Sequence, residues 1–139
     1  MNENILILEH DARFIKKREP FLRFYDGVLS IGKPSYGKYF IPRKEGINPL
    51  TSKRYLPGAH AYLVSPFAAD QMIREARNGI PRPTDVFIHT QTFPWIQEYY
   101  PWFVEVEDTF TTVQSKEKGC KSKHAFRLNE KNYKIIDVE

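Results

Sequence analysis

Four aliphatic residues, Ile5–Leu8, are followed at once by Glu9, His10 and Asp11. A short apolar run bounded by polar residues is typical of a buried central strand. The side chains after such a strand lie at the end of the sheet, where α/β proteins bind ligands. This stretch therefore predicts a central strand. The polar residues after it are either ordinary surface residues or part of a metal or catalytic site.

The next clear signals predict strands over residues 28–32, 59–64 and 103–106 and one helix. Ser65 and Pro66 mark the helix start, because serine caps free backbone N–H groups and proline suits the first helical position. Gly79 marks its end after Asn78. Strands alternating with a helix predict an α/β fold, although the strands are few for a complete open sheet. The expected buried stripe of the helix contains Ala69, Met72, Ile73 and Ala76.

Two segments lack the pattern of a long helix or a clear strand. Residues 33–57 are rich in proline and glycine and predict a long loop or irregular hairpin, long enough to be functional. Thr84 or Asp85 is expected to cap a short helix or turn over residues 84–88. We divide the chain into a domain over residues 1–114 and a basic C-terminal extension over residues 115–139.

The charge balance constrains the partners only weakly. The net charge is +4, which permits attraction to phosphates, but a solvated basic surface is the simpler explanation. A nucleic-acid binder ranks last, because the chain carries no recognised motif or clear basic stripe.

The expected compartment follows from three features. The single cysteine, Cys120, excludes an internal disulfide and suits a reducing compartment. No apolar run approaches the roughly 20 residues needed to span a bilayer, and the N-terminus does not resemble a signal peptide. We therefore expect a cytoplasmic protein without a membrane span, with peripheral attachment to a membrane as an alternative.

Three segments in this order resemble glycosyltransferase family 25, the lipopolysaccharide and collagen-type glycosyltransferases. They are "LILEHDARF", then "GAHAYLVSPFAADQMI", then "PTDVFI" with a later "TFTTVQS". The family has an acidic triplet in the first segment, Gly-x-x-Ala-Tyr-x-Ile/Val-Ser in the second and Pro-Val-Asp in the third. The resemblance covers residues 5–115. No single motif is specific, but three in the same order and spacing are much stronger.

The resemblance implies a GT-A type fold that binds a nucleotide-sugar donor, such as a UDP-sugar, beside carboxylates and a divalent metal. Glu9 and Asp11 match the outer residues of the acidic triplet, and with His10 between them they would hold Mn²⁺ or Mg²⁺. Such cations prefer carboxylate oxygens and can neutralise the leaving nucleoside diphosphate. Asp85 matches the Asp of the third motif, as a further metal ligand or as the base that takes the acceptor's proton.

The resemblance also points to residues that would contact the sugars. His60 and Tyr62, in the second segment, would face the sugar or lie beneath it, although one of them is readily explained as a hydrogen-bonded core residue. In the loop over residues 33–57, the ring of Tyr36 would stack on a sugar face and help to shape the acceptor site.

The chain departs from the family pattern in two ways. His10 replaces the middle Asp of the triplet, which removes a negative charge and changes the expected metal affinity. The family also has a longer region before the triplet, containing much of the nucleotide pocket. We therefore expect a partial GT-A-like fold whose N-terminal nucleotide-binding half is missing. The chain could be a fragment, have a late start, depend on a second chain for that half, or be a degenerate relative. A sheet cut in this way would expose a strand edge that favours pairing with another chain.

The leading hypothesis is metal-dependent transfer of a hexose from a nucleotide-sugar to a hydroxyl of a glycan or protein. Whether this chain is an enzyme by itself depends on whether another half completes it. The alternative is a truncated, non-catalytic relative that acts as a glycan- or partner-binding module.

Overall fold

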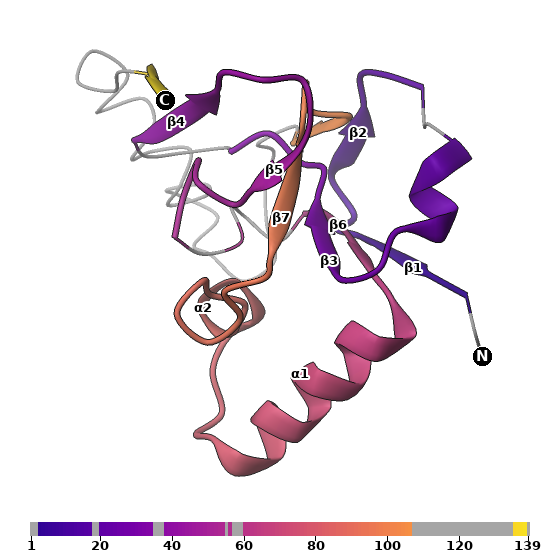
Figure 1. Cartoon of the computed structure of the whole chain (residues 1–139), viewed down its shortest axis with the longest axis vertical. Helices are drawn as coiled ribbons and strands as arrows, with labels where there is room; N and C mark the ends of the chain where they lie inside the picture. Colours follow the sequence, from indigo (N-terminus) through magenta and orange to yellow (C-terminus); the bar gives the residue numbers. More distant parts are fainter. Residues whose placement is uncertain are drawn as a thin grey trace, which may run out of the picture.

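A five-stranded mixed sheet forms the centre of the protein (Figure 1). The computed structural model describes residues 3–17, 20–34, 38–54, 56, 60–106 and 135–138. The third and fourth strands in the spatial order of the sheet are parallel, and the other neighbouring pairs are antiparallel. The strands follow the order β1 (Ile5–Leu8), β6 (Ala61–Val64), β3 (Val28–Ser30), β7 (Gln97–Tyr100) and β5 (Gly46–Pro49).

Two small two-stranded sheets flank this centre. β2 (Ala12–Phe14) pairs antiparallel with β8 (Val104–Val106), and β4 (Tyr39–Pro42) pairs parallel with β9 (Ile135–Val138). The prediction of a long loop or irregular hairpin over residues 33–57 is therefore wrong, because β4 and β5 both lie there and pair with strands distant in sequence. The expected α/β class is confirmed at the level of a mixed sheet with helices.

The main helix, α1 (Pro66–Asn78), has the predicted bounds. The Ser65 hydroxyl caps it by accepting from the backbone N–H of Ala68 at 3.2 Å. The same oxygen accepts from the N–H of Gly27 at 2.9 Å and donates to Asp26 Oδ1 at 2.7 Å. The first turn of α1 is thereby tied to the start of β3, where Gly27 has a φ of +132° that favours glycine.

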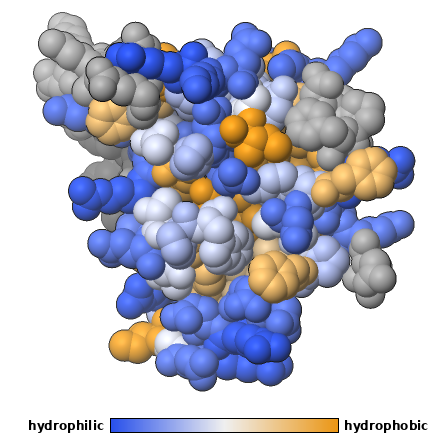
Figure 2. All heavy atoms as spheres, in the orientation of Figure 1, coloured by the Kyte–Doolittle hydropathy of each residue, from blue (hydrophilic) through white to orange (hydrophobic). Residues whose placement is uncertain are grey.

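The predicted buried stripe of α1 is only half correct. Ala69 and Met72 pack against the core, but Ile73 and Ala76 are exposed. Figure 1 shows the reason: α1 runs away from the sheet, and no other described helix or strand lies along its second half. Isolated apolar groups are visible at that far end in Figure 2.

The remaining helices are short. α2 (Thr84–Phe87) starts after Pro83 and has no side-chain cap, so the predicted capping by Thr84 or Asp85 is wrong. A 3-10 helix, η1 (Pro20–Phe24), leads towards β3. Among the helices in the described ranges, none is long and apolar enough to cross a bilayer.

The first strand lies at the edge of the sheet, which corrects the prediction of a buried central strand. β1 pairs only with β6 among the described strands. Its side chains remain accessible, with exposed fractions of 55% for Ile5, 37% for Ile7 and 43% for Leu8. An aliphatic run is typical of a strand in the middle of a sheet, with a neighbouring strand on each side. In the described part of the chain, β1 has a neighbouring strand on one side only.

Two apolar clusters form the core, one on each face of the sheet. In β6 the side chains alternate, so that Tyr62 belongs to one cluster and Leu63 to the other. The first cluster is closed by Ala68 of α1 and by Ile88, the residue directly after α2. The second contains Phe103, Val104, Leu22, Leu29, Ile31, Ala61 and Leu63.

Candidate functional site

The acidic residues after β1 lie beside the start of β6. The backbone N–H of Glu9 donates to the carbonyl of His60 at 3.0 Å and so extends the pairing of the two strands. The chain then turns, with the N–H of Ala12 donating to the carbonyl of Glu9 at 3.1 Å. In this turn Glu9 and His10 are exposed, whereas Asp11 is half-buried.

His60 is buried against Gly32, and its side chain is only 1% exposed. A Cβ at position 32 would collide with the Nε2 and Cδ2 atoms of the imidazole. Glycine is therefore required here by the close approach of the ring. Gly32 in turn bridges to Val104 of β8, which places the ring at the junction of the main sheet and a flanking sheet.

Asp11 and His60 carry buried polar atoms that have no well-aligned hydrogen-bond partner among the described residues. These atoms are Asp11 Oδ1 and both ring nitrogens of His60. Burial lowers the pKa of His60 to about 4, against the opposing influences of the Asp11 carboxylate and of the Lys33 backbone. The imidazole is thus neutral at pH 7, with a lone pair available. Buried polar atoms of this kind are costly unless a proton, cation or ligand satisfies them.

Tyr62 lies in the core beneath α1 and is 5% exposed. Burial raises the pKa of its hydroxyl, and the charge of Glu9 raises it further. The structure therefore brings Glu9 close to Tyr62 and Asp11 close to His60, at the same end of the sheet.

Two other expected site residues fall outside the described side chains. Asp85 lies in α2, and its side chain is outside the described ones. Tyr36 also lies outside the described residues. Within the described ranges, no group of three or more His, Cys, Asp or Glu side chains is arranged to hold a metal ion.

Such a cation does not require three protein ligands. Mg²⁺ in particular is usually held by one or two carboxylates together with substrate phosphates and water. Asp11 and Glu9 have the donor chemistry for that arrangement. Within the described residues Asp11 Oδ1 has no hydrogen-bond partner, and Glu9 is exposed directly after β1. By donor type, the two carboxylates fit a hard cation.

A second group of buried polar residues surrounds Glu98, and the sequence did not predict it. Its side chain is fully buried in the sheet. Glu98 Oε1 accepts from the backbone N–H groups of Thr51 at 3.2 Å and Ser52 at 3.0 Å, and the Ser52 hydroxyl donates to Oε2 at 2.5 Å. Burial raises the pKa of Glu98, and these donors oppose the rise. The carboxyl group thus fixes the chain after β5, a long-range role with no local sequence signal.

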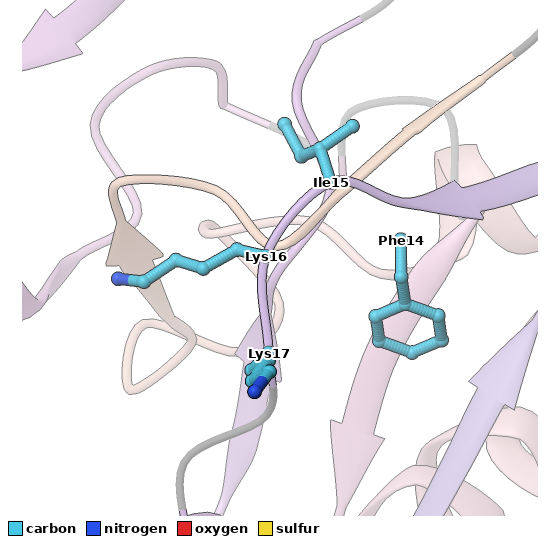
Figure 3. A pocket seen from close by; sticks show the side chains of 4 residues that line it. All are labelled: Phe14, Ile15, Lys16 and Lys17. Carbon is cyan, nitrogen blue, oxygen red and sulfur yellow. The ribbon is translucent and has the colours of Figure 1, made fainter.

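A shallow hollow of about 510 Å³ follows β2. Figure 3 shows Lys16 and Phe14 extending to opposite sides of the backbone, with Ile15 and Lys17 also lining the hollow. The Nζ atom of Lys16 lies 4.8 Å from the ring centroid of Phe103 and 5.3 Å from that of Tyr99. These cation–π contacts hold Lys16 against the protein.

Comparisons with protein-family models, with curated proteins and with solved structures find no match to this chain.

Proposed function

We propose that the chain is a glycosyltransferase-like domain of the family 25 type, with a partial GT-A-like fold. It would transfer a hexose from a nucleotide-sugar to a hydroxyl of a glycan or protein. The observation that supports this proposal best is the buried oxygen of Asp11, which has no hydrogen-bond partner in the described part of the chain and lies near the neutral imidazole of His60. A carboxylate in that state is suited to a cation rather than to a structural hydrogen bond.

Glu9 and Asp11 would hold Mg²⁺ or Mn²⁺, with His10 beside them. When bound, the metal would neutralise the charge that develops on the leaving nucleoside diphosphate. The chain's own contribution is to fix the carboxylates. The hydrogen bond from the Glu9 N–H to the His60 carbonyl anchors the turn that contains Asp11.

Asp85 is proposed as the base that accepts the proton of the acceptor hydroxyl or as a further metal ligand. The acceptor is expected to lie near the segment that contains Tyr36. A second polypeptide that supplies the nucleotide-binding half is part of this proposal.

The test is calorimetric titration of the purified chain with UDP, with and without Mn²⁺. We expect binding that requires Mn²⁺ and that falls at least roughly tenfold in Asp11→Asn, because the variant removes a charged ligand. Asp70→Asn is the matched control, since Asp70 is exposed on α1 and pairs only with Arg74 among the described ion pairs. A folded chain that binds UDP equally well with and without Mn²⁺ would contradict the proposed metal site. No binding at all would show that this chain by itself is not a transferase and would favour the second candidate below.

One observation favours a second candidate, a non-catalytic module that binds a partner chain or a glycan. The aliphatic edge of β1 is exposed and unpaired within the described part of the chain. If this candidate is correct, the chain binds a polypeptide or glycan while Mn²⁺ and UDP have no effect. The calorimetric result for UDP therefore separates the two candidates.

A further inference from the structure

We infer that the free edge of β1 binds an extended, aliphatic segment of another polypeptide as an added β-strand. This inference goes beyond the proposed transfer reaction, because it holds whether or not the chain binds a nucleotide. It rests on the hydrogen-bond pattern of β1, on the contrast between the two edges of the sheet, and on the charges around β1.

The hydrogen-bond pattern shows which backbone groups are available. The N–H of Glu9 bonds to the carbonyl of His60, so residues 9 and 60 form a hydrogen-bonded pair. Such pairs alternate along an antiparallel ladder. The backbone groups of Ile5 and Ile7 therefore point to β6, whereas those of Leu6 and Leu8 point away from it. In the described part of the chain, no strand receives them.

The two edges of the sheet differ in protection. The other edge strand, β5, begins with Gly46 and ends with Pro49, and the charged residues Lys44 and Glu45 precede it. Proline, glycine and charge are the usual devices that keep an edge from pairing. β1 contains neither proline nor glycine, so of the two edges of the main sheet it is the better suited to accept a strand.

The side chains of β1 specify the composition of the incoming strand. Ile5 and Ile7 are exposed on one face of the sheet, and Leu8 is exposed on the other. An incoming strand would be in contact with apolar groups on both faces. A strand that is aliphatic at successive positions fits this environment better than one that alternates apolar and polar residues.

The charges argue for another polypeptide rather than a second copy of this chain. If β1 paired with β1 of a second copy, two antiparallel registers would use the outward backbone groups of Leu6 and Leu8 and place aliphatic residues opposite each other. One centres on Leu6 and places Glu3 opposite Glu9 of the copy. The other centres on Ile7 and places Glu3 opposite Asp11 of the copy. Like charges directly opposite each other are destabilising, whereas a strand flanked by lysine or arginine would be attracted at both ends of β1.

The available length points the same way. β1 offers only four residues for pairing, so strand pairing alone gives a small contact compared with the roughly 1,200–2,000 Å² of a stable interface. A larger partner can cover both exposed faces of β1 as well as its edge. The occupant is therefore an aliphatic strand with basic flanks that belongs to a different polypeptide.

The experiment uses a fluorescent peptide with the sequence Lys-Val-Ile-Val-Ile-Val-Lys, blocked at both ends, and measures its anisotropy as the full chain is added. We expect saturable binding. Leu8→Pro should weaken it by roughly tenfold or more, because proline removes an outward N–H and breaks no bond to β6. Ile5→Lys should weaken it similarly through repulsion of the peptide's lysines. Ile47→Lys is the matched control on β5, where an isoleucine is also exposed, and should bind as the wild type does.

Circular dichroism on each variant confirms that it is folded. Absence of binding, or equal loss in Ile5→Lys and Ile47→Lys, would overturn the inference. So would a dimer of the chain alone that sedimentation detects and that Leu8→Pro abolishes, because the edge would then take a second copy. The peptide titration contains neither UDP nor Mn²⁺, so failure of the nucleotide site and failure of the strand site are distinguishable.

Discussion

At the scale of the residue, the ring of His60 occupies the space in which a side chain at position 32 would begin. We expect Gly32→Ala to lower the free energy of unfolding by about 1–3 kcal/mol, because overpacking in a close-packed interior forces neighbouring groups to move. Chemical denaturation of the variant measures this loss.

The control is the double variant Gly32→Ala/His60→Ala. Removing the imidazole provides room for the new methyl group, so the double variant should lose less stability than the sum of the two single losses, by about 1 kcal/mol or more. Strictly additive losses would show that the two side chains do not compete for the same space.

The buried carboxyl group of Glu98 predicts a pH dependence of stability. Burial raises the pKa of Glu98 above its ordinary value of 4.5. A raised pKa in the folded state means that the stabilising contribution is complete below the unfolded pKa and is lost as the pH rises through the folded pKa. Stability should therefore fall as the pH rises above 4.5.

The variant Glu98→Gln keeps the size of the side chain but cannot ionise. The difference in free energy of unfolding between this variant and the wild type, measured from about pH 4 to about pH 8, isolates Glu98 from the other titrating groups. It should shift in favour of the variant as the pH rises. A difference that is independent of pH would mean that Glu98 titrates alike in the folded and unfolded chains.

At the scale of the element, the helix start at Ser65 connects two parts of the fold, since its hydroxyl contacts Ala68, Gly27 and Asp26. Ser65→Ala should lower the free energy of unfolding by about 1–2 kcal/mol through loss of the cap and of the contacts with the start of β3. Ser65→Thr keeps the hydroxyl and should retain most of the stability. Equal stability of Ser65→Ala and the wild type would contradict this role.

The same element shows what local sequence can predict. The bounds of α1 were predictable because Ser65, Pro66 and Gly79 act on the backbone within one turn. Its buried stripe was not, because the burial of Ile73 depends on whether another part of the fold reaches it. β4, β5 and β7 were missed because they are short, carry polar residues or prolines, and gain their stability from partners far along the chain.

The candidate site also contains some residues that the local sequence predicts and others that it does not. The placement of Glu9 and Asp11 at the end of a strand was predictable from the apolar run before them. The contact of His60 with Gly32 required the register of β6 against its neighbours, and the role of Glu98 required a partner 46 residues away. The contributions of Tyr36 and Asp85 stay predictions.

At the scale of the whole molecule, two apolar clusters share one sheet, and this arrangement predicts a single cooperative unit. Phe103→Ala removes a ring from one face, and Ile88→Ala removes an aliphatic group from the other. Each should lower the free energy of unfolding by about 2–5 kcal/mol, a large part of the total for a small domain. Both should shift the same transition, because β3 and β6 contribute side chains to both clusters.

Unfolding followed by far-ultraviolet circular dichroism and by tryptophan fluorescence should therefore coincide in both variants. Phe67→Ala serves as the control, because Phe67 is exposed on α1 and its loss should change stability little. Separate transitions for the two probes would show that the faces of the sheet unfold independently.

The pairing of β1 with β6 has a consequence for synthesis of the chain. More than fifty residues separate Leu8 from its partner Ala61. At a translation rate of about 5–20 residues per second, the ribosome needs several seconds to produce β6 after β1. During that interval the nascent chain exposes an aliphatic segment with neither edge paired, which is a target for chaperones. Slower translation between the two strands would lengthen this exposure and lower the yield of folded protein.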